Sequence, residues 1–340
     1  MKATDTRDLG RTALTVTQLG YGGAPLGDLY QRIPEAEALG AVESAYTAGV
    51  TLFDTAPLYG HGLSEHRIGH VLRQKPRTSF VLSTKVGRCF VPRQPGQVDR
   101  GQWAGGLDFE PVFDYSYDGV LRSIEQSRLR LGLSTIDIAL IHDVDIWTHG
   151  SREAWEARLA EALKGAYRAL DDLRRAGVVK AIGVGVNEIE ACLRFADGGD
   201  FDCFLLAGRY TLLEQGALDD LLPLVERRSM SVLLGGPYNS GILATGAVPD
   251  ARYNYQPASP EIRNRVARIE AVCRAHGVPL SAAAIQFPLG HKAVASIIPG
   301  AISAAEVERN RDLIEQAIPA ELWADLRRAG LLREDAPTPA

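Results

Sequence analysis

Four side chains that can move or hold a proton stand at or just after short apolar segments. The stretch FDTAPLYGHG places Asp54 and Tyr59 five residues apart, SFVLSTK ends in Lys85, and IDIALIH ends in His142. A tyrosine with an ordinary pKa of about 10 is a poor acid or base at neutral pH, but a nearby ammonium favours the phenolate. We therefore expect Lys85 to lower the pKa of Tyr59 and Asp54 to hold Lys85. His142 would then hydrogen-bond the same substrate oxygen as Tyr59.

Each of these residues also has a plainer structural interpretation. Asp54 would cap the turn DTAP, Lys85 would lie at the surface beyond its strand, and a single His at a strand end is more often a satisfied structural group. Four such residues at corresponding places in successive segments are harder to explain in this way, because a buried Lys or Asp must be paired to stay charged. The pattern therefore favours a proton-transfer site.

Eight short runs rich in Val, Ile, Leu and Phe alternate with amphipathic segments of helical periodicity. The runs are residues 17–23, 50–55, 79–85, 136–142, 179–185, 202–207, 231–236 and 293–299. Runs that are apolar on both faces indicate parallel strands covered by helices, and eight units favour an α/β fold of the closed (β/α)8 TIM barrel type. Gly132, Gly177 and Gly277 each follow a basic turn and indicate helix ends. Chemistry in such a barrel sits at the carboxyl ends of the strands, where the four side chains would meet.

The remaining segments complete a single barrel domain over residues 1–340. RDLGRTALTVTQ predicts an N-terminal β-hairpin that caps the barrel floor. ELWADLRRAG, residues 321–330, predicts a C-terminal extra helix, and the Pro-rich tail at about 332–340 is expected to be disordered. The stretch from Val86 to Asp118, rich in Gly, Pro and aromatic residues, is interpreted as a functional loop.

The overall composition argues against several classes of partner. The net charge of -5 is spread along the chain, so we expect neither nucleic acid nor a membrane surface as a partner. The polar amino terminus and the lack of an apolar run of about 18 residues predict a cytoplasmic protein. The four cysteines form no C-x-x-C pair and argue against a disulfide framework. We expect a small-molecule substrate and a monomer or small homo-oligomer.

Neither a dinucleotide-binding fold nor a metal centre is predicted. LGYGGAPLG lacks the third glycine at the required spacing and places Pro25 where a helix should begin. His61, His66 and His70 invite a metal interpretation, but no H-E-x-x-H pattern accompanies them and His61 falls in a turn. We therefore expect no metal.

At these residues the chain resembles the aldo-keto reductase family. The segments FDTAPLYGHGLSEHRIG, STK, LIHD, GVGVN, and SIIPG followed by AEVERN match the signatures of that family in order, from about Arg7 to Pro319. The resemblance implies a (β/α)8 barrel with a nicotinamide cofactor and no metal. It also implies a catalytic tetrad, whose members here are Asp54, Tyr59, Lys85 and His142.

A narrower likeness lies in FDYSYDGVLRSIEQSRLRLGL, HDVDIWTHG, LLAGRYTLLEQ and GGPYNSGIL. These segments look like the branch that contains D-threo-aldose 1-dehydrogenase (L-fucose dehydrogenase), L-galactose dehydrogenase and pyridoxal 4-dehydrogenase. The implied reaction oxidises the anomeric carbon of an aldose of the L-fucose, D-arabinose or L-galactose type to its lactone, with Tyr59 as general base. Two alternatives stay open: a pyridoxal 4-dehydrogenase or general aldehyde or ketone reductase, and a regulatory subunit that binds nicotinamide without turnover.

The resemblance further implies cofactor contacts at nine positions. They are Asn187 at the nicotinamide carboxamide, Gly235, Gly236 and Pro237 for close backbone approach, and Gly300, Ser303, Glu306, Arg309 and Asn310 at the adenosine. Family members that use NADP often carry Lys or Arg at the places of Gly300 and Glu306, where a 2′-phosphate needs positive charge. We therefore expect NAD to be preferred, while Arg309 leaves NADP possible.

Substrate selection is expected to come from the loops. Aromatic walls are predicted at Tyr30, Phe90, Trp103, Phe113 and Trp147. The polar segment HDVDIW suits a hydroxyl-rich ligand, and within it Asp145 is predicted to bind a sugar hydroxyl.

Overall fold

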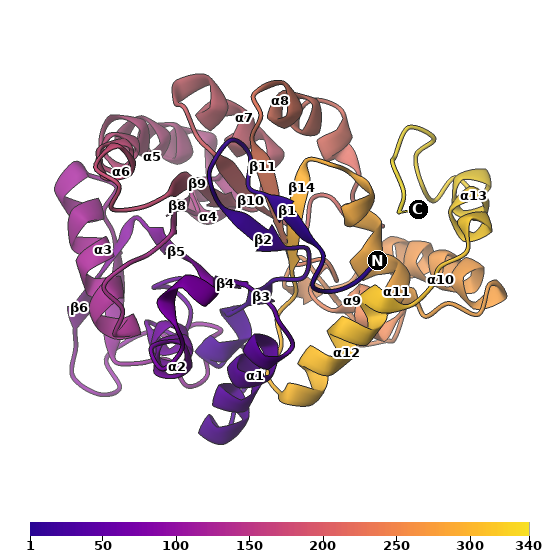
Figure 1. Cartoon of the computed structure of the whole chain (residues 1–340), viewed down its shortest axis with the longest axis horizontal. Helices are drawn as coiled ribbons and strands as arrows, with labels where there is room; N and C mark the ends of the chain where they lie inside the picture. Colours follow the sequence, from indigo (N-terminus) through magenta and orange to yellow (C-terminus); the bar gives the residue numbers. More distant parts are fainter. Residues whose placement is uncertain (340) are drawn as a thin grey trace.

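Eight parallel strands form a barrel at the centre of the computed structural model, which describes residues 1–339 (Figure 1). The barrel strands are β3 (Tyr21–Gly22), β4 (Leu52–Asp54), β5 (Val81–Val86), β8 (Ile138–His142), β9 (Ala181–Val186), β10 (Cys203–Ala207), β11 (Ser231–Gly235) and β14 (Val294–Ile298). They pair in the order β14-β11-β10-β9-β8-β5-β4-β3. Parallel bridges from Leu19 to Ile297 and from Gly22 to Gly300 join the two outer strands. Each strand overlaps its predicted run, so the predicted fold class is confirmed.

Helices surround the strands. They are α1 (Glu35–Thr47), α2 (Leu63–Leu72), α3 (Tyr117–Leu131), α4 (Ile146–His149), α5 (Arg152–Lys164), α6 (Ala166–Arg175), α7 (Ile189–Gly198), α8 (Leu221–Arg227), α9 (Ile242–Thr245), α10 (Pro260–Ala275), α11 (Leu280–Gln286), α12 (Ala304–Glu315) and α13 (Ala320–Arg328). Four 3-10 turns accompany them: η1 (Ala24–Gly27), η2 (Arg77–Ser79), η3 (Gly216–Leu218) and η4 (Phe287–Gly290). Gly132, Gly177 and Gly277 have φ of +65°, +70° and +65°, the left-handed backbone that ends a helix at glycine.

The apolar core has two layers. The larger layer lies between the strands and the surrounding helices. A smaller cluster fills the barrel interior, where Leu9, Leu14 and Val16 pack on inward-facing strand residues such as Leu140 and Leu233. These three residues belong to the hairpin of β1 (Thr6–Asp8) and β2 (Thr15–Thr17) and its turn, so the hairpin closes the amino-terminal end of the barrel as predicted. The hairpin leaves the carboxyl ends of the strands uncovered, so a site can form at that end of the barrel.

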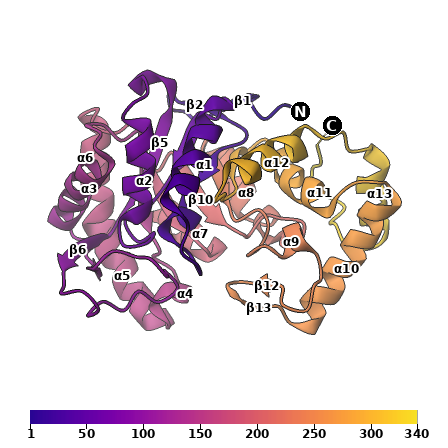
Figure 2. The ribbon, with the colours of Figure 1, turned by 90° about the horizontal axis from the view of Figure 1, so that it is seen from below.

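Irregular segments gather at the end of the barrel opposite the β1–β2 hairpin (Figure 2). Within 86–118, β6 (Arg88–Pro92) and β7 (Phe109–Phe113) form an antiparallel pair, which the interpretation of this stretch as a loop did not include. A second hairpin follows β11 and consists of β12 (Arg252–Tyr253) and β13 (Gln256–Pro257). These additions lie beside the mouth of the barrel.

The tail after α13 differs from the expected disorder. Leu332 and Ala336 are buried, and Arg327 Nη2 donates to the carbonyl of Ala336 over 2.7 Å. The backbone of Pro337 and Thr338 packs closely on Gly290, where a methyl group would lie 2.7 Å from both residues. The missing side chain of Gly290 allows this close approach, which composition alone does not reveal. Ala340, the last residue of the expected tail, lies outside the described residues.

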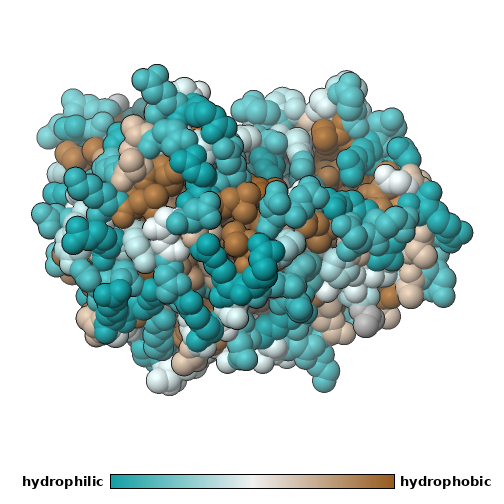
Figure 3. All heavy atoms as spheres, turned by 90° about the horizontal axis from the view of Figure 1, so that it is seen from above, coloured by the Kyte–Doolittle hydropathy of each residue, from teal (hydrophilic) through white to brown (hydrophobic). Residues whose placement is uncertain are grey.

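One face of the molecule is mainly hydrophilic, with apolar side chains confined to separate patches (Figure 3). Among residues 1–339, no helix combines the length and the apolar character needed to cross a bilayer.

Candidate active site

The four predicted proton-transfer residues meet at the carboxyl ends of neighbouring strands. Asp54 ends β4, Lys85 lies near the end of β5, His142 ends β8, and Tyr59 follows β4 in the loop that leads to α2. The register places Asp54 beside Ser83 and Lys85 beside Leu140, so the ends of these strands lie side by side. The barrel topology thus gathers residues that are up to 88 positions apart in the chain into one site.

Lys85 and Asp54 form a buried ion pair. The Lys85 side chain is 1% exposed, and its Nζ lies 2.7 Å from Asp54 Oδ2 and donates to the carbonyl of Thr55 over 2.8 Å. Ser83 Oγ donates to the other Asp54 oxygen over 2.8 Å. Burial alone would lower the pKa of Lys85, but the charges of Asp54 and Tyr59 and their hydrogen bonds raise it above its usual value. Lys85 is therefore an ammonium at neutral pH.

Glycine at position 185 makes room for this ion pair. A methyl group added to Gly185 would lie 3.3 Å from Lys85 Cε, which is tighter than most contacts of this kind. The Lys85 chain therefore runs past β9 inside the barrel before it reaches Asp54. In the motif GVGVN, which matches the aldo-keto reductases, the second glycine is Gly185. Its close packing against Lys85 explains why a glycine stands there.

The Tyr59 ring lies directly against the ammonium. Lys85 Nζ is 4.7 Å from the ring centroid of Tyr59, and the His142 ring stands edge-on to it at 5.8 Å between centroids. Burial raises the pKa of Tyr59 above its ordinary value, and Lys85 opposes that effect without outweighing it. The ammonium thus lowers the pKa of Tyr59 as expected, but burial is the larger effect and the net shift is upward. The phenol is protonated at neutral pH and is set as a proton donor.

His142 is held as a neutral imidazole. Burial, followed by the positive charges of Arg88 and Lys85, lowers its pKa well below the ordinary value. Arg88 Nη1 lies 3.2 Å from His142 Nδ1, and because a guanidinium only donates, Nδ1 must accept and Nε2 carries the proton. Tyr115 fixes the backbone by donating its hydroxyl to the His142 carbonyl over 2.7 Å. The imidazole can therefore donate one hydrogen bond to a substrate oxygen.

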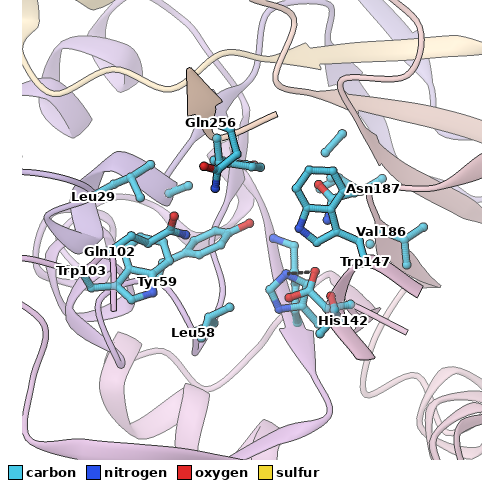
Figure 4. A pocket seen from close by; sticks show the side chains of 18 residues that line it. Leu29, Leu58, Tyr59, Gln102, Trp103, His142, Trp147, Val186, Asn187 and Gln256 are labelled. Atoms are coloured by element: carbon cyan, nitrogen blue, oxygen red, sulfur yellow. Dashed lines mark ion pairs between the residues drawn. The ribbon is translucent and has the colours of Figure 1, made fainter. Parts of the chain in front are cut away.

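A cavity of about 300 Å³ opens above these residues (Figure 4). Tyr59 and His142 face it together with Trp103 and Trp147, two of the predicted aromatic walls. Its polar rim consists of Gln102, Asp143, Thr148, Asn187 and Gln256. Trp103 also packs on Tyr59, with ring centroids 5.7 Å apart. A cavity with an aromatic wall on two sides and hydrogen-bonding groups between them suits a small polar ring.

A second cavity of the same volume adjoins the first and shares Tyr59 and Tyr255 with it. Its lining includes the predicted cofactor residues Gly235, Gly236, Pro237 and Gly300. A methyl group at Gly236 would meet nothing nearer than 3.6 Å, and one at Gly241 would meet nothing within 4 Å, so side chains there would project into open space. The glycines therefore leave backbone exposed to a bound molecule. Together with Asn187, which lines the first cavity, these residues fit an extended nicotinamide cofactor.

The other predicted cofactor residues lie at the N-cap of helix α12 and within the helix. Ser303 Oγ accepts from the Glu306 backbone over 3.3 Å, and Glu306 Oε2 accepts from the Ile302 backbone over 2.9 Å, as in a capping box. Asn310 is buried and accepts from the Tyr238 hydroxyl over 2.9 Å, whereas Arg309 is exposed. Tyr238 also lines the second cavity, so its hydrogen bond to Asn310 links α12 to that cavity.

Asp145 does not reach the substrate cavity, and its predicted role needs correction. It is 0% exposed and caps α4, where Oδ1 accepts from the Thr148 backbone over 2.9 Å. Oδ2 accepts from the Asn187 backbone over 2.9 Å. Both carboxylate oxygens are thus used within the chain. Asp145 instead holds the backbone of Asn187 in place.

Three predicted aromatic walls also lie away from the cavity. Phe90 stacks under Arg130, with the guanidinium 4.7 Å from the ring centroid, and Phe113 does the same under Arg88 at 4.5 Å. Tyr30 is exposed and packs near Arg252, although its neighbour Leu29 lines the cavity. Phe90 and Phe113 belong to the β6–β7 pair, whose alternation turns their rings to cationic partners.

Several residues that line the two cavities were not predicted from the sequence. Tyr255 touches both cavities and sits at the tip of the β12–β13 hairpin, where Asn254 and Tyr255 both have positive φ, 50° and 62°. Two such residues form the turn of a tight hairpin, and neither is the glycine that would mark it in the sequence. Asp143 could have been found, because it directly follows His142.

The histidines that invited a metal interpretation do not converge. Among the described residues, no three or more His, Cys, Asp or Glu side chains are grouped to hold a metal ion. His61 is buried beside Phe90, with ring centroids 6.5 Å apart.

Comparisons with known proteins agree with this geometry. The model of the aldo/keto reductase family matches residues 18–330. Pyridoxal 4-dehydrogenase of Microbacterium luteolum is 43% identical over 342 residues, covering 98% of this chain and 99% of that protein. D-threo-aldose 1-dehydrogenase of a Pseudomonas species is 40% identical over 331 residues and covers 96% of both chains. An aldo-keto reductase from Bacillus halodurans, solved in its holo form, superimposes with a TM-score of 0.74 at 22% identity over 96% of both chains and supports the fold.

Proposed function

The chain belongs to the aldo/keto reductase family, and we propose that it oxidises the anomeric carbon of an aldose to a lactone with NAD as hydride acceptor. Members of this family are oxidoreductases that use NAD(P)H, so the reaction class follows from membership. The sugar substrate and the preference for NAD are the proposal. The observation that carries it is the group formed by Tyr59 and the buried residues Asp54, Lys85 and His142 at a cavity with a polar rim.

The four residues divide the proton chemistry between them. The bound cofactor supplies the acceptor for the hydride that leaves the anomeric carbon. His142 donates through Nε2 to the reacting oxygen and orients it. Tyr59 accepts the proton of the anomeric hydroxyl as its carbonyl forms, and it does so as the phenolate, which the ammonium of Lys85 stabilises. Asp54 holds Lys85 charged and in place.

The Trp103 and Trp147 walls and the rim of Gln102, Asp143 and Gln256 support a hydroxylated ring as substrate. Aromatic faces pack on the C–H face of a sugar, while amides and carboxylates bind its hydroxyls. The test is NAD reduction by L-fucose, D-arabinose, L-galactose and pyridoxal. We expect turnover with at least one sugar at a higher kcat/KM than with pyridoxal.

The second candidate is pyridoxal oxidation, which the 43% identity to a pyridoxal 4-dehydrogenase favours. The same aromatic walls would accept a pyridine ring, and the proton chemistry of Tyr59 and His142 would be unchanged. Turnover of pyridoxal alone in the substrate panel would replace the sugar proposal with this one. No turnover of any of the four compounds would contradict both and favour a nicotinamide-binding role without catalysis.

The residues at the start of α12 lead us to propose that the protein prefers NAD over NADP. Glu306 is exposed there and its carboxylate would repel a 2′-phosphate, whereas it can accept a hydrogen bond from a free ribose hydroxyl. Gly300 offers no positive charge on the facing loop.

We expect Glu306→Arg to raise the ratio of kcat/KM for NADP over NAD by about 10- to 100-fold, because a hydrogen bond to a charged group is worth about 1.5–3 kcal/mol. Steady-state kinetics with both cofactors measures the ratio. Glu306→Gln keeps the helix-capping contact with Ile302 and removes only the charge, so we expect a smaller shift. Glu308→Arg, at an exposed neighbour on α12, is the control for net charge. A wild-type chain that prefers NADP would contradict the proposal.

We further propose a cytoplasmic protein, monomeric or a small homo-oligomer, that acts on a small molecule. All four cysteines are free and buried, as is common for chains of a reducing compartment.

A further inference from the structure

One residue that lines the first cavity, Asp143, carries a carboxylate that the proton chemistry does not use. Asp143 lines this cavity beside His142, and its side chain is 13% exposed. Its backbone has φ of 55°, the left-handed region that non-glycine residues seldom adopt, and its N–H donates to the carbonyl of Gly185 over 2.9 Å. A strained backbone held in this way at a site suggests that the direction of the side chain matters.

Arg88 holds the Asp143 carboxylate in position. Arg88 is buried on β6, and its Nη2 lies 2.9 Å from Asp143 Oδ2 while its Nη1 reaches His142 Nδ1. The guanidinium stacks on Phe113 at 4.5 Å, which limits its movement. One rigid cation thus sets the positions of both His142 and Asp143.

The arrangement places a donor and an acceptor side by side. Because Arg88 occupies Nδ1, the proton of His142 is on Nε2, and Asp143 Oδ1 lies 3.3 Å from that atom. Both atoms belong to residues that line the cavity. Oxygens on neighbouring carbons of a sugar ring lie a similar distance apart, so one can accept from His142 while the other donates to Asp143.

We propose that Asp143 is a specificity-determining residue that binds the hydroxyl on the carbon next to the reacting carbon. This inference rests on the proposed function, in which His142 binds the anomeric oxygen and the neighbouring hydroxyl is that of C2. A charged acceptor forms a strong hydrogen bond with a neutral hydroxyl. It loses that bond when the hydroxyl is missing and repels an oxygen that carries negative charge. The site therefore selects 2-hydroxylated aldoses over deoxy sugars.

The test compares D-arabinose with 2-deoxy-D-ribose, which is D-arabinose without its C2 hydroxyl. We expect the wild type to favour D-arabinose by about 100-fold or more in kcat/KM, since a site built to bind a hydroxyl strongly rejects the analogue that lacks it. Asp143→Ala should bring the ratio to within about threefold of unity, mainly by slowing D-arabinose. A purely structural role would slow both sugars equally and leave the ratio unchanged.

Two further variants keep the test decisive. Asp143→Asn retains the shape and an acceptor oxygen, so it should fold even if Asp143→Ala does not, and it should lower the ratio about tenfold. Asp118→Ala removes an exposed carboxylate on α3 and should leave the ratio at the wild-type value. Turnover of D-arabinose with a ratio unchanged by either Asp143 variant would overturn the inference alone. Absence of aldose turnover in the wild type would overturn the proposed function and the inference with it.

Discussion

Replacement of Tyr59 by Phe is expected to lower kcat for aldose oxidation by about 10²- to 10⁴-fold, the usual contribution of a positioned acid or base. The ring packs between Lys85, Trp103 and His142, and Phe preserves those contacts while it removes the hydroxyl proposed to take the proton. The affinity for NAD should change little. Quenching of tryptophan fluorescence on NAD binding, together with steady-state rates, measures both quantities.

The pH dependence of the oxidation rate, measured for the wild type and for Tyr59→Phe, gives a second test. The proposed oxidation needs the Tyr59 phenolate, and burial holds the pKa of Tyr59 above its ordinary value of 10.0. The wild-type rate should therefore rise with pH from 7 to 9, by up to about tenfold per unit while the chemical step limits the rate. His142 adds no acid limb in this range, because its pKa lies well below 6.5. The residual rate of Tyr59→Phe should not rise in this way.

Two outcomes would contradict this assignment. Turnover of Tyr59→Phe within a few-fold of the wild type would show that another group takes the proton. Equal and undetectable turnover of both proteins, with NAD bound by both, would favour the nicotinamide-binding role without catalysis.

The parts of the site that lie on strands could be predicted from the sequence. Asp54, Lys85 and His142 end buried parallel strands, and barrel topology requires such ends to meet. Alternation of strands and helices is a local signal, since burial on both faces leaves an apolar run in the sequence. Tyr59 follows from its short distance to Asp54 along the chain.

The residues that were misplaced depend on contacts between distant segments. Asp145 stands in a polar segment suited to a sugar, but its partners are Thr148 and the backbone of Asn187, 42 positions away. Phe113 was predicted to line the pocket, but in the structure its ring stacks against the Arg88 guanidinium. The direction in which the pKa of Tyr59 shifts depends on the balance between burial and the charge of Lys85. The sequence shows the charge but not the extent of burial.

The ion pair of Lys85 and Asp54 should carry a large share of the local stability, because neither charge can reach water. We expect Lys85→Met to lower the free energy of unfolding by about 3–5 kcal/mol, since it leaves the Asp54 carboxylate buried without its partner. The double variant Asp54→Asn with Lys85→Met buries no charge and should regain most of that loss. Urea unfolding of the wild type and the two variants measures the difference.

The two variants separate the structural part of the ion pair from its catalytic part. Both lack the ammonium that stabilises the Tyr59 phenolate, so both should lose about 10²-fold or more in aldose oxidation at neutral pH, although only one is strongly destabilised. If the double variant were as unstable as Lys85→Met, the loss would come from the packing of the lysine chain past Gly185 and not from an unpaired charge. If it recovered activity together with stability, Lys85 would serve only to hold the strands together. The expected result, a stable but inactive double variant, would mean that the buried charge is retained for its effect on Tyr59.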